Sequence, residues 1–147
     1  MDFLKFREIN FNKMKKYIIT FLFSLVVFFI LGGVFGTLVF LPEMTSWYKA
    51  FPNAVRETPD FVSGFIVGLV QLIGAILLVD KLKIIDLKSG AIFGIIYSVA
   101  LWLIIDLQMV STTNIVTYRY VGLDALLSAF MGAAIGLVVT WSLKKYA

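Results

Sequence analysis

The sequence predicts an all-α membrane protein in which four transmembrane helices form an antiparallel bundle with both termini in the cytoplasm. Of the 147 residues, 61% are hydrophobic and 15% are charged, whereas soluble domains contain about 45–50% apolar and about 25% charged residues. Four apolar stretches are each about as long as the 20 residues that a helix needs to cross a bilayer. The basic residues gather on one side of these stretches. We therefore expect a single transmembrane domain over residues 1–147.

The predicted spans cover about residues 17–41, 61–79, 91–110 and 120–143. Hydrocarbon offers no water to the backbone N–H and C=O groups, so spans of this length are helices rather than strands. The connections at 80–89 and near 111–114 are short and polar. Short connections favour antiparallel neighbours, so we expect consecutive spans to lie side by side.

The first span resembles a secretory signal peptide at its start, where Lys15 and Lys16 precede an apolar run. The apolar region of a signal peptide is about 7–15 residues long, whereas this run reaches Leu41 with no small-x-small cleavage site after it. We expect a retained helix. Met14 offers an alternative translation start, and the mixed apolar and basic residues 1–13 are typical of a segment that lies along the membrane surface.

The longest connection is predicted at residues 42–60, on the outer side of the membrane. Met44, Trp47, Tyr48 and Phe51 follow the spacing of an amphipathic helix. We expect this helix to rest on the outer leaflet, and the alternative is a lid or a docking element for a partner. The run Thr58-Pro59-Asp60 then predicts a helix start, with Thr58 as N-cap and Asp60 in the first turn.

The basic residues predict the orientation, because cytoplasmic segments carry the excess of Lys and Arg. Ten of them lie on the side of both termini: Lys5, Arg7, Lys13, Lys15, Lys16, Lys81, Lys83, Lys88, Lys144 and Lys145. The other side has three: Lys49, Arg56 and Arg119. The formal net charge of +4 is thereby explained by topology, and we expect lipid rather than nucleic acid as the partner.

Each predicted span contains a GxxxG motif, which lets two helix backbones approach closely in lipid. The motifs are Gly32/Gly36, Gly64/Gly68, Gly90/Gly94 and Gly132/Gly136. Residues four apart form matching rows in spans three and four and bring together Gly90 with Thr140, Gly94 with Gly136, Ser98 with Gly132 and Asp106 with Asp124. A similar pairing is expected of Gly32 with Gly68 and of Gly36 with Gly64. Some of these small residues must face another helix pair or a second subunit.

Polar residues within the spans are the candidate functional site, because a carboxylate at membrane depth is costly unless it is paired, protonated or hydrated. Gln71, Asp106 and Asp124 lie inside spans, and Arg119 begins the fourth. One interpretation is structural, with Arg119 paired to Asp106 and Asp124 bonded to Tyr120. The other is an outward-facing acidic vestibule in which Asp106 and Asp124 bind a cation or a proton and Gln71 lies deeper.

The chain contains no Cys and no His, which excludes disulfides, thiol nucleophiles and sites that need imidazole ligands. We found no motif for a cofactor or a metal and no catalytic set, nor the diagnostic motifs of fluoride channels, small multidrug transporters or lipoprotein signal peptidases. Three hypotheses follow for a protein of a bacterial or archaeal cytoplasmic membrane. They are a homo-oligomer or accessory subunit of a larger membrane complex, a small cation- or proton-coupled transporter or channel, and an enzyme acting on lipid.

Overall fold

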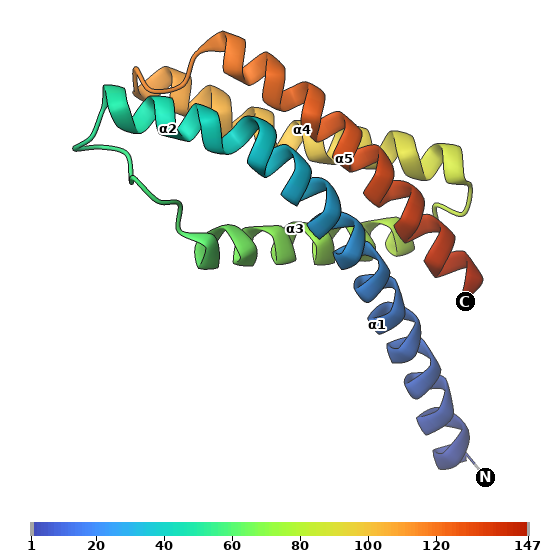
Figure 1. Cartoon of the computed structure of the whole chain (residues 1–147). Helices are drawn as coiled ribbons and strands as arrows, with labels where there is room; N and C mark the ends of the chain where they lie inside the picture. Colours follow the sequence, from blue (N-terminus) through green and yellow to red (C-terminus); the bar gives the residue numbers. More distant parts are fainter. Residues whose placement is uncertain (1, 147) are drawn as a thin grey trace.

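The computed structural model describes residues 2–146, and the side chains of residues 14–146. The helices are α1 (Asp2–Phe35), the π-helix η1 (Gly36–Phe40), α2 (Leu41–Ala50), α3 (Phe61–Lys81), α4 (Leu87–Thr112) and α5 (Tyr118–Lys145) (Figure 1). No strand occurs within residues 2–146. The side chains of residues 1–13, with the predicted surface segment and Lys5, Arg7 and Lys13, lie outside the part that is described.

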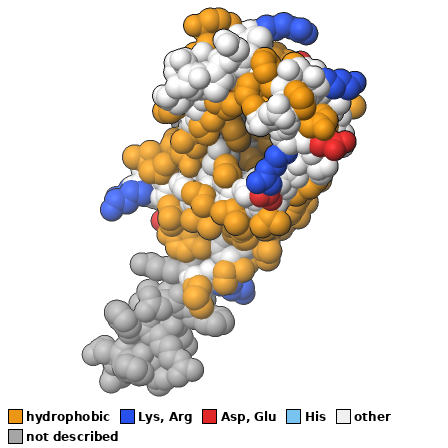
Figure 2. All heavy atoms as spheres, turned by 90° about the vertical axis from the view of Figure 1, so that its left-hand side faces the viewer, with side chains coloured by type: hydrophobic (Ala, Val, Ile, Leu, Met, Phe, Trp, Pro, Cys, Tyr) orange, Lys and Arg blue, Asp and Glu red, His pale blue; other side chains and the backbone are white. Residues whose placement is uncertain are grey.

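Four helical segments are long and apolar enough to cross a membrane: Met14–Ala50, Phe61–Lys81, Leu87–Thr112 and Tyr118–Lys145. Their outward faces are apolar, and side chains such as Val70, Ile104 and Phe130 are more than 60% exposed. Figure 2 shows hydrophobic side chains over much of the surface on the side of the 51–60 connection, with charged side chains at several places among them. A surface of this kind suits lipid rather than water. The prediction of four helices long and apolar enough to cross a membrane is confirmed.

The first span is longer than predicted, since helical structure continues through Pro42 to Ala50 rather than ending at Leu41. The η1 segment explains how a proline is accommodated there. The Leu41 N–H donates to the Gly36 carbonyl five residues back, and this wider turn precedes the residue that lacks an N–H group. Pro42 then occupies the first turn of α2, where no donor is needed. The connection between the first two spans is therefore 51–60.

Helix α2 contacts α5 through an aromatic pair, and none of its residues is buried. It continues the path of α1 (Figure 1). The ring of Trp47 meets the ring of Tyr120 on α5 edge to face, with centroids 4.7 Å apart. The backbone of α2 leaves the helical conformation at Phe51, the residue before Pro52, as is common before proline.

The N-cap of α3 is Asp60, not Thr58 as predicted. Its carboxylate accepts hydrogen bonds from the Val62 N–H at 3.1 Å and the Ser63 N–H at 3.2 Å. Pro59 therefore precedes the cap, and the helix begins two residues later than predicted because Asp itself is a strong N-cap. Hydrogen bonds from the Ser63 hydroxyl and backbone hold the pKa of Asp60 below its usual value.

Helix α5 is the centre of the fold, because it shares the most extensive interface with α4 and also packs along α1, whereas α3 meets its neighbours at few places. The buried core lies between α3 and α5, in the half of the molecule where α3 ends and α5 ends. It consists of Leu72, Ile76, Val79, Val139 and Leu143. The opposite half, where α3 and α5 begin, is not filled in this way, and the candidate site lies there.

Glycines allow the close approach of α4 and α5. A Cβ built on Gly94 would lie 2.8 Å from the Gly132 carbonyl carbon, and Gly90 lies against the Gly136 carbonyl in the same manner. Backbone atoms cannot move away from a new Cβ by changing rotamer, as a side chain can, so only glycine fits at this helix crossing. The contacts expected from the rows of small residues, such as Ser98 with Gly132, occur here.

The corresponding pairing between the first two spans does not form. A Cβ on Gly32, Gly36 or Gly64 would meet nothing within 4 Å, and Gly68 faces the ring of Phe28. A short motif determines which residues share one face of a helix, but not which face of the neighbouring helix meets it. Near Gly32 and Gly64, α3 is not in close contact with α1.

Candidate functional site: a cavity with a buried carboxyl pair

A cavity of about 370 Å³ lies between α3 and the other helices, in the half of the molecule away from the core. This volume falls within the range of about 300–1,000 Å³ that is typical of small-molecule sites. Its walls come from every helical segment: Phe28, Gly32, Phe40, Met44, Trp47, Gly64, Val67, Gly68, Gln71, Ser98, Trp102, Tyr120, Asp124, Ser128, Met131 and Ile135.

The cavity exists partly because glycines stand where side chains would otherwise fill the space. Gly32 and Gly64 both line it, and neither has an atom within 4 Å of the position its Cβ would take. The GxxxG motifs thus have two different roles in this structure. Those of α4 and α5 bring backbones together. In the motifs of α1 and α3, Gly32 and Gly64 border the hollow, and Gly68 leaves room for the ring of Phe28.

Asp106 on α4 and Asp124 on α5 meet at this cavity, Asp124 in its wall and Asp106 behind it. Asp106 is 5% exposed and Asp124 is 3% exposed. The Oδ2 atom of each is buried and receives no hydrogen bond from a donor among the described residues. The two carboxyl groups lie close enough to interact with each other. Two ionised carboxylates buried side by side repel each other, which favours a proton on one of them.

Arg119 is exposed and forms no ion pair with Asp106, so the structural interpretation of the sequence is wrong on this point. The reason is helical phase. Arg119 precedes Asp124 by five positions, which corresponds to a rotation of about 140° around a helix with 3.6 residues per turn. Since Asp124 faces α4, Arg119 points away from it. The expected bond between Tyr120 and Asp124 is not formed either.

Gln71 lies on α3 and is among the residues that line the cavity. Its backbone carbonyl accepts a hydrogen bond of 3.1 Å from the Tyr97 hydroxyl of α4. The link between α3 and α4 at this depth thus uses the main chain of Gln71.

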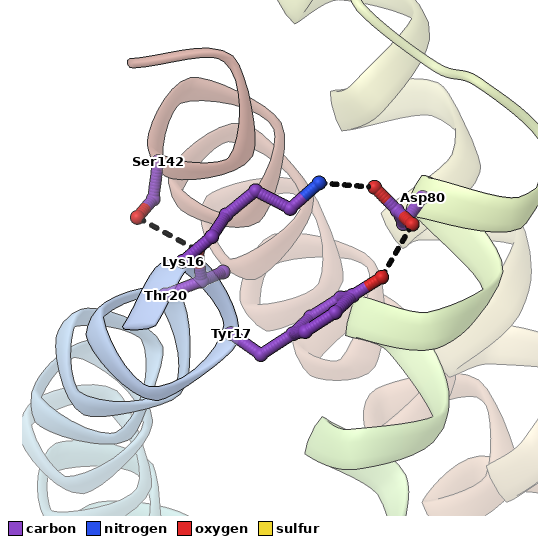
Figure 3. Close-up of polar contacts among 5 residues, drawn as sticks. All are labelled: Lys16, Tyr17, Thr20, Asp80 and Ser142. Atoms are coloured by element: carbon purple, nitrogen blue, oxygen red, sulfur yellow. Dashed lines mark hydrogen bonds and ion pairs between the residues drawn. The ribbon is translucent and has the colours of Figure 1, made fainter. Parts of the chain in front are cut away.

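The opposite end of α3 is held by polar contacts that sequence analysis missed (Figure 3). Asp80 accepts hydrogen bonds from the Lys16 ammonium group at 2.8 Å and the Tyr17 hydroxyl at 2.6 Å. A bond of 2.9 Å joins the fully buried hydroxyls of Thr20 and Ser142. We name Lys16, Tyr17 and Asp80 the α1–α3 clamp. The opposite charges of Lys16 and Asp80 at the same predicted membrane surface were the available indication in the sequence.

Comparisons with protein-family models, with characterised proteins and with solved structures found no match. Within residues 14–146, no group of three or more acidic side chains is arranged to hold a metal ion. The site therefore consists of two buried, neighbouring carboxyl groups beside a largely aromatic and apolar cavity.

Proposed function

We propose that the protein is a small proton-coupled transporter in which Asp106 and Asp124 bind the coupling proton and the adjoining cavity binds the solute. The observation that supports it is the buried carboxyl pair at the cavity wall. A pair with one proton carries one negative charge, and a buried charge without a partner costs several kcal/mol. A second proton or a bound cation removes that charge, so occupancy of the cavity is linked to protonation.

In this proposal the bundle is antiparallel, with both termini in the cytoplasm of a bacterial or archaeal cell. The excess of Lys and Arg on the side of the termini supports this orientation. It places the carboxyl cavity in the outer half of the membrane and the α1–α3 clamp in the inner half. The structure then corresponds to a state in which the outer half is hollow and the inner half is packed.

The experiment is a flux assay in proteoliposomes that hold a pH-sensitive dye. Neutral, anionic and cationic solutes are added outside, and the luminal pH is followed. We expect at least one class of solute to change the luminal pH with wild-type protein, and Asp124→Asn to abolish the change. Asp60→Asn is the matched control, because Asn caps a helix as well as Asp does. Absence of solute-driven proton movement for all three classes would refute the proposal.

A second candidate function is that of a homo-oligomeric or accessory membrane subunit. The observation in its favour is an open surface at Gly33 and Gly36 in the first span, where no atom lies within 4 Å of the position that a Cβ would take. Small residues of this kind mark helix contacts in membranes. Native mass spectrometry from mild detergent tests it, since a monomeric mass without bound subunits would contradict this role.

A further inference from the structure

We propose that the solute is a small organic ammonium ion with an aromatic or branched apolar group, and that it competes with a proton for the Asp106–Asp124 pair. This inference rests on the proposed function, because it names the class of molecule that the cavity takes. Three properties of the cavity support it: its charge, its aromatic walls and its size.

The charge of the site favours a cation. Asp124 is only 3% exposed, and its Oδ2 atom accepts no hydrogen bond from any described residue. No Lys or Arg is among the residues that line the cavity. The other titratable groups nearby are Tyr120 on α5 and Glu43 on α2, which interacts with Tyr120. Helices α1 and α3 and the η1 segment contribute only uncharged residues to the wall, so an anion would find repulsion without compensation.

Aromatic rings lie one helical turn from each carboxyl group. Tyr120 precedes Asp124 by four residues on α5, and Trp102 precedes Asp106 by four on α4, which puts each pair on one helix face. Trp47 extends this wall from α2 through its edge-to-face contact with Tyr120. Indole and phenol faces attract ammonium groups, most strongly when the cation is desolvated.

The same walls argue against an inorganic cation. Hard cations such as Ca²⁺ require six to eight oxygen ligands, whereas the polar side chains of the wall are few and dispersed among aromatic and aliphatic groups. An organic ammonium ion needs one counter-charge and an apolar surface. The volume of about 370 Å³ accommodates a molecule with one ring and a trimethylammonium group.

The test uses benzyltrimethylammonium and its uncharged carbon isostere, neopentylbenzene, with the full chain in lipid nanodiscs. Binding is measured by calorimetry between pH 5 and pH 8. We expect the cation to bind at least tenfold more tightly than the isostere. At pH values below the one at which the pair takes up its second proton, binding of the cation must displace that proton. The affinity for the cation should therefore fall about tenfold for each unit by which the pH is lowered, and one proton should be released for each cation bound.

Two variants separate a role of the carboxyl group from a loss of folding. Asp124→Asn should reduce the affinity for the cation at least tenfold and remove its dependence on pH. Gly64→Leu keeps both carboxyl groups and projects a side chain into the hollow from a position with no neighbour within 4 Å. It should weaken binding at least tenfold while the resistance to unfolding stays at the wild-type level.

Equal binding of cation and isostere would overturn the inference and identify the occupant as an apolar molecule such as a lipid chain. Unchanged cation binding in folded Gly64→Leu would also overturn it. Cation binding that meets these expectations without coupled flux in proteoliposomes supports the ligand class and refutes transport. Flux that depends on Asp124 but is driven only by neutral or anionic solutes refutes the ligand class and leaves transport in place.

Discussion

Replacing Gly94 by Ala should separate α4 from α5. The new Cβ would lie 2.8 Å from the carbonyl carbon of Gly132 and still closer to its oxygen, whereas ordinary contacts of a Cβ lie at 3.4–4 Å. The helices must therefore part by more than half an ångström. A gap of about 0.5–1 Å forfeits a quarter to a half of the dispersion energy of each facing contact. Overpacking of this kind costs about 1–3 kcal/mol, so we expect a loss of about 2 kcal/mol.

Gly64→Ala is the matched control for this prediction. Both glycines belong to GxxxG motifs and both substitutions gain the same helix propensity, but a Cβ at position 64 meets nothing within 4 Å. Unfolding of each variant by sodium dodecyl sulfate in mixed micelles, followed by circular dichroism, measures the difference. Equal stability of the Gly94→Ala and Gly64→Ala variants would refute the close packing of α4 on α5.

Three further predictions concern the clamp, the cap of α3 and the orientation. Lys16→Met removes the ion pair to Asp80, whose members are 16% and 34% exposed, and should cost about 1 kcal/mol in the same unfolding assay; an unchanged midpoint would contradict the clamp. The pKa of Asp60 is lowered in the folded state, so its stabilisation of the fold is present above the pKa of the unfolded chain and is lost as the pH falls through the folded pKa. Protection of the amides in the first turn of α3 against hydrogen exchange should decrease over the same pH range. The Asp60→Asn variant should show no such pH dependence. The chain has no Cys, so a membrane-impermeant maleimide should label Glu57→Cys from outside intact cells and leave Lys144→Cys unlabelled, and the reverse pattern would contradict the orientation.

The number of spans could be predicted from sequence because length and apolar composition determine whether a helix can cross a bilayer. The meeting of Asp106 with Asp124 was also accessible, since both belong to rows of residues spaced by four that match in depth across one hairpin. The close approach of Gly94 and Gly132 follows from the same rows.

Other features depend on how each helix is rotated about its axis and on how far apart the helices lie. The spacing of residues along one helix does not determine either quantity. Arg119 was assigned to Asp106 by depth alone, and its position around α5 turns it away. Pro42 indicates a helix end in most contexts, but the η1 turn before it lets the helix continue to Ala50. The hollow beside Gly32 and Gly64 lies toward the other end of α3 from Asp80, whose contact with Lys16 joins residues 64 positions apart.

The central claim is that one proton is shared by the Asp106–Asp124 pair beside the cavity. Infrared spectroscopy of the protein in nanodiscs at neutral pH tests it most directly, through the C=O stretching band of a protonated carboxyl group. We expect the wild type to show this band, the double variant with Asp106→Asn and Asp124→Asn to lose it, and Asp60→Asn to retain it. A wild-type protein without the band, or a double variant that keeps it, would contradict the account.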